Sequence, residues 1–308
     1  MDEFNLWEQA QPWVKKMHGQ IPSRIEIQQL TKTLGIDLTT SILYQAILAS
    51  KRDGSFIQTL KQIPLIVSKQ QTTKSQTVKV LIIPAMYFQQ HPELGSDGKI
   101  MHHVASQLGI STEIIPTLSL GSVQQNAEII AHVIRQKTCD HLIICTLSKG
   151  ASDFRLAMER FIPEHAHRIQ AWINISGTLH GSACVDAMLD STVKRLWFKL
   201  LCRGIGADYG CLDELRTAHP FWQSKWELPH STNVINILPL PLIPHVHKQL
   251  SKRYHVLSYQ GPNDGVMLPH DAIYQAGFIY PVWGCDHFMR TPFIGTLLRR
   301  VFLYLLQY

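Results

Sequence analysis

The stretch IICTLSKGAS, residues 143–152, decides the fold that this sequence predicts. Its apolar first half is typical of a buried strand, and a helix is predicted to begin at Ser148. A sharp strand-to-helix turn would lift the Ser148 hydroxyl above a sheet and point the next backbone NH at developing negative charge. Such a turn needs small residues two positions before and after the serine. Gly150 meets this need, whereas Thr146 stands where glycine is usual.

Strand and helix patterns alternate on both sides of this stretch. The predicted strands cover residues 78–84, 112–116, 140–147, 169–175, 234–238, 255–259 and 279–283, and the predicted helices cover residues 97–108, 122–136, 148–161 and 292–308. Nearly continuous apolar strands between amphipathic helices indicate a parallel sheet that is covered on both faces. The sequence therefore predicts a doubly wound, mainly parallel α/β fold over residues 78–308.

Two regions depart from the alternation. Residues 1–63 are predicted to be helical, with a capping box at Ser23 and Glu26, a second helix over 40–51 and a stop at Asp53-Gly54. A polar loop at 70–77 would complete a helical N-terminal extension and linker, residues 1–77. Residues 178–232 carry apolar clusters at 196–201 and 221–222, which predict either a lid-like insertion or packed core.

Composition limits the classes of function. The chain has 308 residues, of which 45% are hydrophobic and 17% charged, as in globular proteins. The acidic N-terminus and the absence of a long apolar run predict no classical export and a cytoplasmic location. The net charge of +6 comes from scattered Lys and Arg residues, so no nucleic-acid partner is expected. Weak association with an anionic membrane surface remains a hypothesis.

Two more residues complete a possible catalytic set with Ser148. Asp264 lies in an Asn-Asp-Gly segment that is predicted to follow a strand, and His287 follows the last strand. The carboxyl ends of parallel strands converge on one crevice, so these side chains are expected to meet. Asp286, beside His287, is the alternative acid.

These segments resemble those of the α/β-hydrolase superfamily. The sequence Thr-Leu-Ser-Lys-Gly at 146–150 is similar to its Gly-x-Ser-x-Gly nucleophile elbow, and the order Ser, Asp, His matches. Residues 176–182 resemble the His-Gly-Ser stretch of bacterial triacylglycerol lipases, with Asp186 near the position of that family's following aspartate. Residues 84–87 occupy the place of the oxyanion loop without its His or Gly. The resemblance covers residues 78–308 and leaves out the N-terminal helices.

The resemblance implies a lipase- or esterase-like serine hydrolase with a catalytic triad of Ser148, Asp264 and His287. The backbone NH groups of Met86 and Lys149 would form the oxyanion hole, and a small-molecule or lipid ester would be the substrate. Two alternatives stay open: an inactive binding module, which Thr146 and the altered oxyanion loop favour, and an acyltransferase with the same triad.

Neither a cofactor nor a metal is expected. The pairs His165/His167 and His245/His247 would each share one face of a strand, but they lack Cys or carboxylate partners at ligand spacing. The glycines of residues 204–210 do not match the dinucleotide-binding spacing. The oligomeric state is not predicted.

Overall fold

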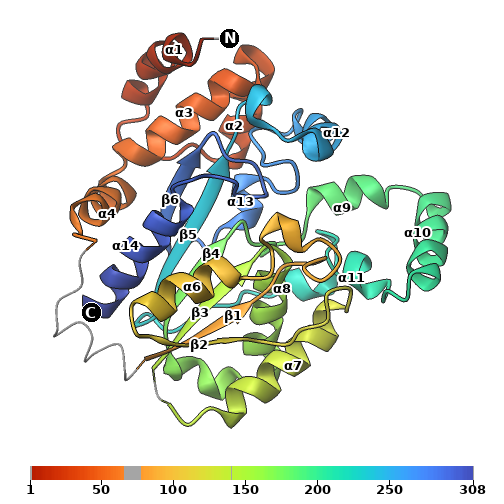
Figure 1. Ribbon diagram of the computed structural model, residues 1–308. Coiled ribbons are helices and arrows are strands. Elements are labelled where there is room, and N and C mark those ends of the chain that lie inside the picture. The colour runs from red at the N-terminus through yellow and green to blue at the C-terminus, as the bar shows by residue number, and fades with distance from the viewer. Residues whose placement is uncertain (1, 66–77, 140, 308) are drawn as a thin grey trace.

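The computed structural model describes residues 2–65, 78–139 and 141–307 (Figure 1). Its six-stranded sheet has the strand order β2-β1-β3-β4-β5-β6, and every neighbouring pair is parallel. The strands are β1 Val78–Ile83, β2 Ser111–Ile114, β3 His141–Leu147, β4 Ile169–Ile175, β5 Asn233–Leu240 and β6 Phe278–Trp283. The predicted doubly wound fold is confirmed. The polar loop expected at 70–77 lies outside the described residues.

Alternating side chains of each strand enter two different cores. Val80 and Ile82 of β1 belong to one hydrophobic cluster, and Leu81 and Ile83 belong to the other. The helices that contribute to the first core include α3 Ile36–Ala49, α4 Lys51–Gln62, α6 Lys99–Gln107 and α14 Ile294–Gln307. Those of the second core include α7 Val123–Gln136 and α8 Lys149–Leu156. Both faces of the sheet are therefore buried, which explains the continuous apolar strands.

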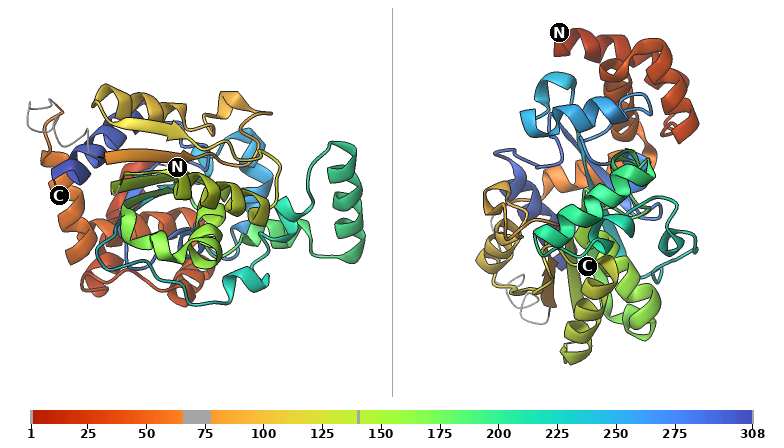
Figure 2. Two further views of the ribbon diagram at one scale, coloured as in Figure 1. Left: turned by 90° about the horizontal axis from the view of Figure 1, so that it is seen from below. Right: turned by 90° about the vertical axis from the view of Figure 1, so that its right-hand side faces the viewer.

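The N-terminal helices form part of the layer that covers the sheet (Figures 1 and 2). Besides α3 and α4 they comprise α1 Glu3–Lys16 and α2 Arg24–Leu34. The Phe56 ring of α4 stacks on Phe278 of β6 at a centroid distance of 4.4 Å. The Asp53 carboxylate also accepts a hydrogen bond from the Ile279 backbone NH at 2.9 Å. Helices α2, α3 and α4 thus contribute to the first core beside the edge strand β6.

The predicted helix stop at Asp53-Gly54 is wrong. The Ser50 side chain accepts a hydrogen bond from the Asp53 backbone NH, so α4 begins at Lys51 and runs through both residues. Gly54 is needed for a different reason: a Cβ there would lie 2.3 Å from the Leu48 carbonyl oxygen. The glycine thus allows α3 and α4 to meet at a close turn.

The predicted strand at 255–259 is also wrong, because residues 255–257 end helix α12, Lys248–Leu257. The buried residues of α12 are Leu250, Tyr254 and Leu257, whose spacing of four and three is helical. The short apolar run at the end of this helix is by itself compatible with a strand. Together with the preceding turn, its buried residues follow the helical spacing.

The insertion at 178–232 contains one buried apolar cluster and one exposed apolar cluster. It includes α9 Ala183–Met188, α10 Thr192–Gly204, α11 Gly210–Asp213 and a 3-10 turn at Pro220–Trp222. Phe221 and Trp222 are buried in the second core, whereas α10 projects from the body and exposes most of its apolar residues (Figures 1 and 2). None of the helices in the described ranges is both long and apolar enough to cross a bilayer.

Replacing Gly54 by Ala is expected to lower the free energy of unfolding by at least about 1 kcal/mol, because the added Cβ would overlap the Leu48 carbonyl. Helix propensity alone predicts a gain of about 1 kcal/mol. The matched control is Gly204→Ala near the end of α10, where nothing lies within 4 Å of the added Cβ. Urea unfolding of both variants should give opposite signs, and a stabilised Gly54→Ala protein would contradict this packing.

Candidate active site

Ser148 lies at a strained turn between β3 and α8. Its backbone has φ 47° and ψ −117°, and its NH donates to the Ile175 carbonyl of β4 at 3.0 Å. Positive φ is uncommon outside glycine and costs free energy, so such residues cluster at functional sites. A Cβ at Gly150 would lie 2.7 Å from the carbonyl oxygens of both Ile83 and Pro84. Glycine is therefore required two residues after the serine.

Thr146, the departure from the usual motif, is accommodated in the sheet. It is fully buried in β3, and its hydroxyl accepts a hydrogen bond from the Trp172 indole NH at 2.9 Å. The same hydroxyl lies 3.5 Å from the Asn174 side-chain oxygen. Because both partners belong to the neighbouring strand β4, the threonine side chain is occupied between strands and leaves the turn at Ser148 intact.

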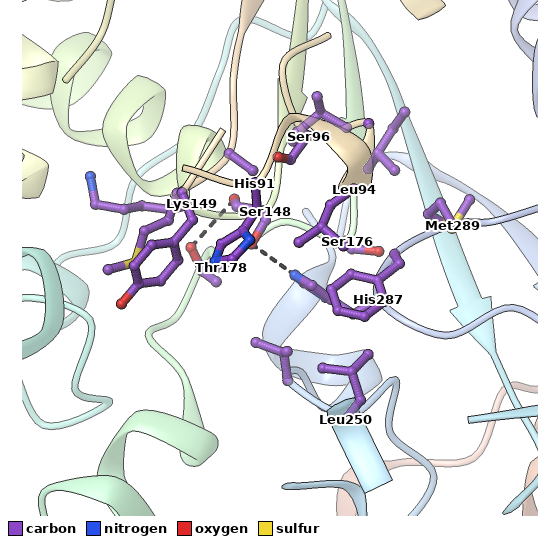
Figure 3. A pocket seen from close by; sticks show the side chains of 18 of the residues that line it. His91, Leu94, Ser96, Ser148, Lys149, Ser176, Thr178, Leu250, His287 and Met289 are labelled. Carbon is purple, nitrogen blue, oxygen red and sulfur yellow. Dashed lines mark hydrogen bonds between the residues drawn. The ribbon is translucent and has the colours of Figure 1, made fainter. Parts of the chain in front are cut away.

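Ser148, His287 and Asp264 form one hydrogen-bonded chain. The Ser148 Oγ lies 2.9 Å from His287 Nε2 (Figure 3). On the other side of the imidazole, His287 Nδ1 lies 2.8 Å from Asp264 Oδ2. Since an ionised carboxylate only accepts, Nδ1 carries the proton and Nε2 is left to accept one from the serine. The structure brings together the three side chains that the sequence singled out.

Asp264 is held by its own turn. Its Oδ1 accepts hydrogen bonds from the backbone NH groups of Val266 and Met267, at 2.8 and 2.6 Å, and the residue is 2% exposed. The carboxylate that faces His287 is therefore fixed before any ligand binds. The turn follows α12 in the connection between β5 and β6, and so it does not follow a strand as the sequence suggested.

Asp286, the alternative acid, has other partners. Its Oδ2 accepts from the His247 backbone NH at 2.7 Å and its Oδ1 from the Phe288 backbone NH at 3.0 Å. It thereby links the loop after β6 to the start of α12. Nothing in these contacts directs its carboxylate to the imidazole of His287.

The two residues expected to supply backbone NH groups, Met86 and Lys149, both line the cavity that contains Ser148. Among the described residues, neither NH has a hydrogen-bond acceptor. Lys149 is the first residue of α8, where NH groups lack partners within the helix and favour an anion. Both groups are therefore available to a bound oxyanion.

The Lys149 side chain points away from His287 (Figure 3) and ends in a buried ion pair. Its Nζ lies 2.7 Å from Asp153 Oδ1, one turn along α8, and Asn126 donates to the other carboxylate oxygen at 2.9 Å. Burial raises the pKa of Asp153 to about 6, against the opposing effect of the Lys149 ammonium and the Asn126 amide. The hydrogen bond from Asn126 connects α8 to α7, and the ion pair holds the Lys149 side chain within α8.

Ser176 is a cavity residue for which the sequence predicts no individual role. It follows β4 as Ser148 follows β3, also has φ 47°, and donates its NH to Ile237 of the next strand. Its hydroxyl is buried without a hydrogen-bond partner in the described chain, although the residue lines the cavity. Only its position directly after a predicted strand could have indicated a role at the cavity, because backbone strain cannot be recognised in the sequence. The hydroxyl is available to bind a ligand.

The cavity that contains Ser148 is mostly apolar and has a volume of about 550 Å³. Its walls come from the loop after β1, the insertion, α12 and the start of α14. The apolar wall includes Met86, Leu94, Ile100, Val185, Met188, Leu212, Leu215, Leu250, Val266 and Leu298. Among its charged residues are the exposed Arg253 and Arg290. A site of this size and character suits an apolar ligand with a polar reacting group.

Neither pair of histidines lies on a strand. His165 and His167 lie in the 3-10 helix Pro163–Arg168, and His245 ends another such helix and contacts Glu3 through Nε2 at 3.0 Å. Within the described ranges, no group of three or more His, Cys, Asp or Glu side chains could hold a metal ion.

Asp186, which the lipase resemblance had singled out, binds Thr217. Its two carboxylate oxygens accept from the backbone NH and the hydroxyl of that residue. Asp186 therefore ties α9 to a later part of the insertion and does not enter the hydrogen-bonded chain at Ser148.

Several solved structures share this fold. The crystal structure of the metagenomic carboxyl esterase MGS0156 is 20% identical over 79% of this chain and 78% of that chain, with a TM-score of 0.62. Bacillus licheniformis lipase BlEst2 in its mature form is 19% identical over 75% of this chain and 92% of that chain, with a TM-score of 0.53. No protein-family model and no curated protein matches the sequence. The chain has the α/β-hydrolase fold, as the resemblance implied.

Replacing Ser148 by Gly is expected to raise the free energy of unfolding by up to about 1 kcal/mol relative to Ser148→Ala. Both variants remove the hydroxyl, but only glycine relieves the positive φ of 47°. Chemical denaturation of the two proteins measures the difference. Equal stabilities would mean that the turn at Ser148 stores no backbone strain.

Proposed function

We propose that this protein is a serine hydrolase that cleaves carboxylic esters with an apolar acyl group. The observation that carries the proposal is the chain of hydrogen bonds from Ser148 through His287 to Asp264 at an apolar cavity. A serine hydroxyl is a weak nucleophile unless a positioned base removes its proton, and this arrangement supplies that base. The names of the structures with the same fold, a carboxyl esterase and a lipase, are consistent with this chemistry.

Acylation would proceed through a tetrahedral intermediate. As the Ser148 Oγ forms a bond to the ester carbonyl carbon, His287 Nε2 takes the hydroxyl proton and Asp264 stabilises the imidazolium. The carbonyl oxygen gains the negative charge, which the backbone NH groups of Met86 and Lys149 would stabilise. The carbon–oxygen bond to the alcohol then breaks, and the imidazolium gives its proton to the departing oxygen.

Deacylation repeats these steps with water. His287 takes a proton from the water as its oxygen attacks the acyl carbon, and a second tetrahedral intermediate forms. The bond to the Ser148 Oγ then breaks, the serine regains its proton from His287, and the carboxylic acid leaves.

The two alternatives differ in what happens at Ser148. Thr146 had favoured an inactive binding module, but its hydroxyl is engaged by Trp172 and does not disturb the turn at Ser148, so this reason is weakened. An acyltransferase would use the same residues with an alcohol or thiol in place of water. Product analysis with and without an added alcohol separates the acyltransferase from the hydrolase.

A fluorophosphonate probe is expected to label the native protein at Ser148 and to leave Ser148→Ala unlabelled. Replacing Asp264 by Asn should lower kcat/KM for a soluble ester by about 10³–10⁴-fold, because the amide no longer holds the required imidazole tautomer. Peptide mapping of the labelled protein and initial-rate kinetics measure the two effects.

The matched control is Asp286→Asn, which changes the neighbouring carboxylate in the same way. Within the described residues, the Asp286 carboxylate accepts hydrogen bonds from backbone NH groups alone, so the folded variant should show no comparable loss of kcat/KM. A large loss in Asp286→Asn with retained activity in Asp264→Asn would reverse the assignment. Unlabelled native protein without turnover of any ester would favour the inactive binding module.

Among p-nitrophenyl esters, kcat/KM is expected to rise with each CH₂ of the acyl chain until the cavity is filled. Burial of one CH₂ is worth about 0.8 kcal/mol, or roughly fourfold, if the chain enters the apolar wall. The same series with Ser148→Ala gives the background rate. A kcat/KM that is highest for acetate would show that the apolar cavity does not receive the acyl group.

A further inference from the structure

Helix α10 carries its most apolar side chains on the face that is exposed to solvent. Val193, Leu196, Trp197 and Leu200 are 78%, 60%, 57% and 61% exposed. Six of the 16 exposed large apolar side chains in the described chain lie between residues 193 and 205. Exposed apolar residues are ordinary when they are scattered, whereas a contiguous group marks an interaction surface.

The exposed residues form a single stripe, because 193, 196, 197 and 200 are separated by three or four positions and so share one helix face. The opposite face contacts the protein. Cys202 is 4% exposed, Phe198 is half-buried, and the Arg195 guanidinium donates to the Leu189 carbonyl at 3.0 Å. The helix is thus anchored by its less apolar side, and its apolar stripe faces outward.

Cations border the stripe. On a helix of 3.6 residues per turn, Lys194 falls on one side of the stripe, and Lys199 and Arg203 fall on the other. Lys194 forms an ion pair with Asp190 at 2.8 Å, but no Asp or Glu occurs between Asp190 and Asp208, so every charged residue of the helix itself is basic. An apolar face bordered by Lys and Arg is typical of helices that lie in a membrane interface.

We infer that α10 docks this protein on an anionic lipid surface. The helix would lie in the plane of the interface, with the apolar stripe below the headgroups and the cations among the lipid phosphates. Its 13 residues extend about 20 Å, which is too short to cross a bilayer. A second copy of the chain is a less suitable partner for the stripe, because pairing two identical stripes would bring their bordering cations together.

Docking through α10 would also bring the cavity close to the lipid, although the inference does not depend on the proposed hydrolysis. The helices on either side of α10 supply part of the apolar cavity wall: Val185 and Met188 from α9, and Leu212 from α11. Attachment through α10 would therefore hold this wall near a lipid surface.

The test is co-sedimentation of the full chain with two kinds of vesicle, pure phosphatidylcholine and a mixture with about one third phosphatidylglycerol. The native protein should bind the anionic vesicles more tightly. Leu196→Gln/Leu200→Gln should weaken this binding at least about tenfold, because two exposed apolar side chains leave the interface. Lys194→Gln/Arg203→Gln should remove most of the preference for anionic vesicles.

The control for loss of exposed apolar residues is Phe4→Gln/Ile25→Gln on the N-terminal helices, where both side chains are 68% exposed; its binding should equal that of the native protein. The three double variants should hydrolyse a soluble short-chain ester at the native rate. Ser148→Ala should bind vesicles normally, so that loss of catalysis and loss of docking are distinguishable.

Two results would overturn the inference. One is equal vesicle binding by the native protein and Leu196→Gln/Leu200→Gln. The other is self-association of the native chain in sedimentation velocity that this variant abolishes, with no binding to anionic vesicles. The second result would assign the stripe to another copy of the chain.

Discussion

The close crossing of α8 over the end of β1 is the constraint on which the site depends. At Gly150 the helix approaches the carbonyl oxygens of Ile83 and Pro84 so closely that no side chain fits. This approach forces the chain to reverse within a residue or two of β3, and Ser148 takes the strained conformation that results. The same crossing brings the start of α8 beside the loop that contains Met86. One packing contact thus sets both the position of the serine hydroxyl and that of the neighbouring NH groups.

Much of the sheet could be predicted from the sequence because it is buried on both faces. The strands at 78–83, 141–147 and 169–175 are mostly apolar, because the side chains on both of their faces enter a core. Shorter signals were ambiguous. The pattern at 255–259 is compatible with a strand, and only the preceding turn of α12 decides for a helix. The Asp53-Gly54 pair looked like a helix stop, because neither the Ser50 cap nor the close approach of Leu48 is visible in local composition.

The residue types of the candidate site and their order in the chain could be predicted from the sequence, but the hydrogen-bond partners of each residue could not. The sequence placed carboxylates near His287 at both 264 and 286, and propensity does not distinguish them. The distinction lies in which backbone NH groups each carboxylate meets, and these come from Val266 and Met267 in one case and from His247 and Phe288 in the other. The apolar clusters of the insertion pose the same problem, since composition cannot tell the buried Trp222 from the exposed Trp197. Burial is a property of the assembled chain.

The packing of α4 against β6 also has a consequence for the order of synthesis. Phe56 must stack on Phe278, a residue that the ribosome adds 222 residues later. At about 5–20 residues per second, the N-terminal helices wait about 10–45 s for the strand that covers them. During this interval their apolar face has no native partner, so it is open to chaperones and to neighbouring nascent chains. These helices are therefore made well before they can reach their final environment, and His287 is added only after their partner strand.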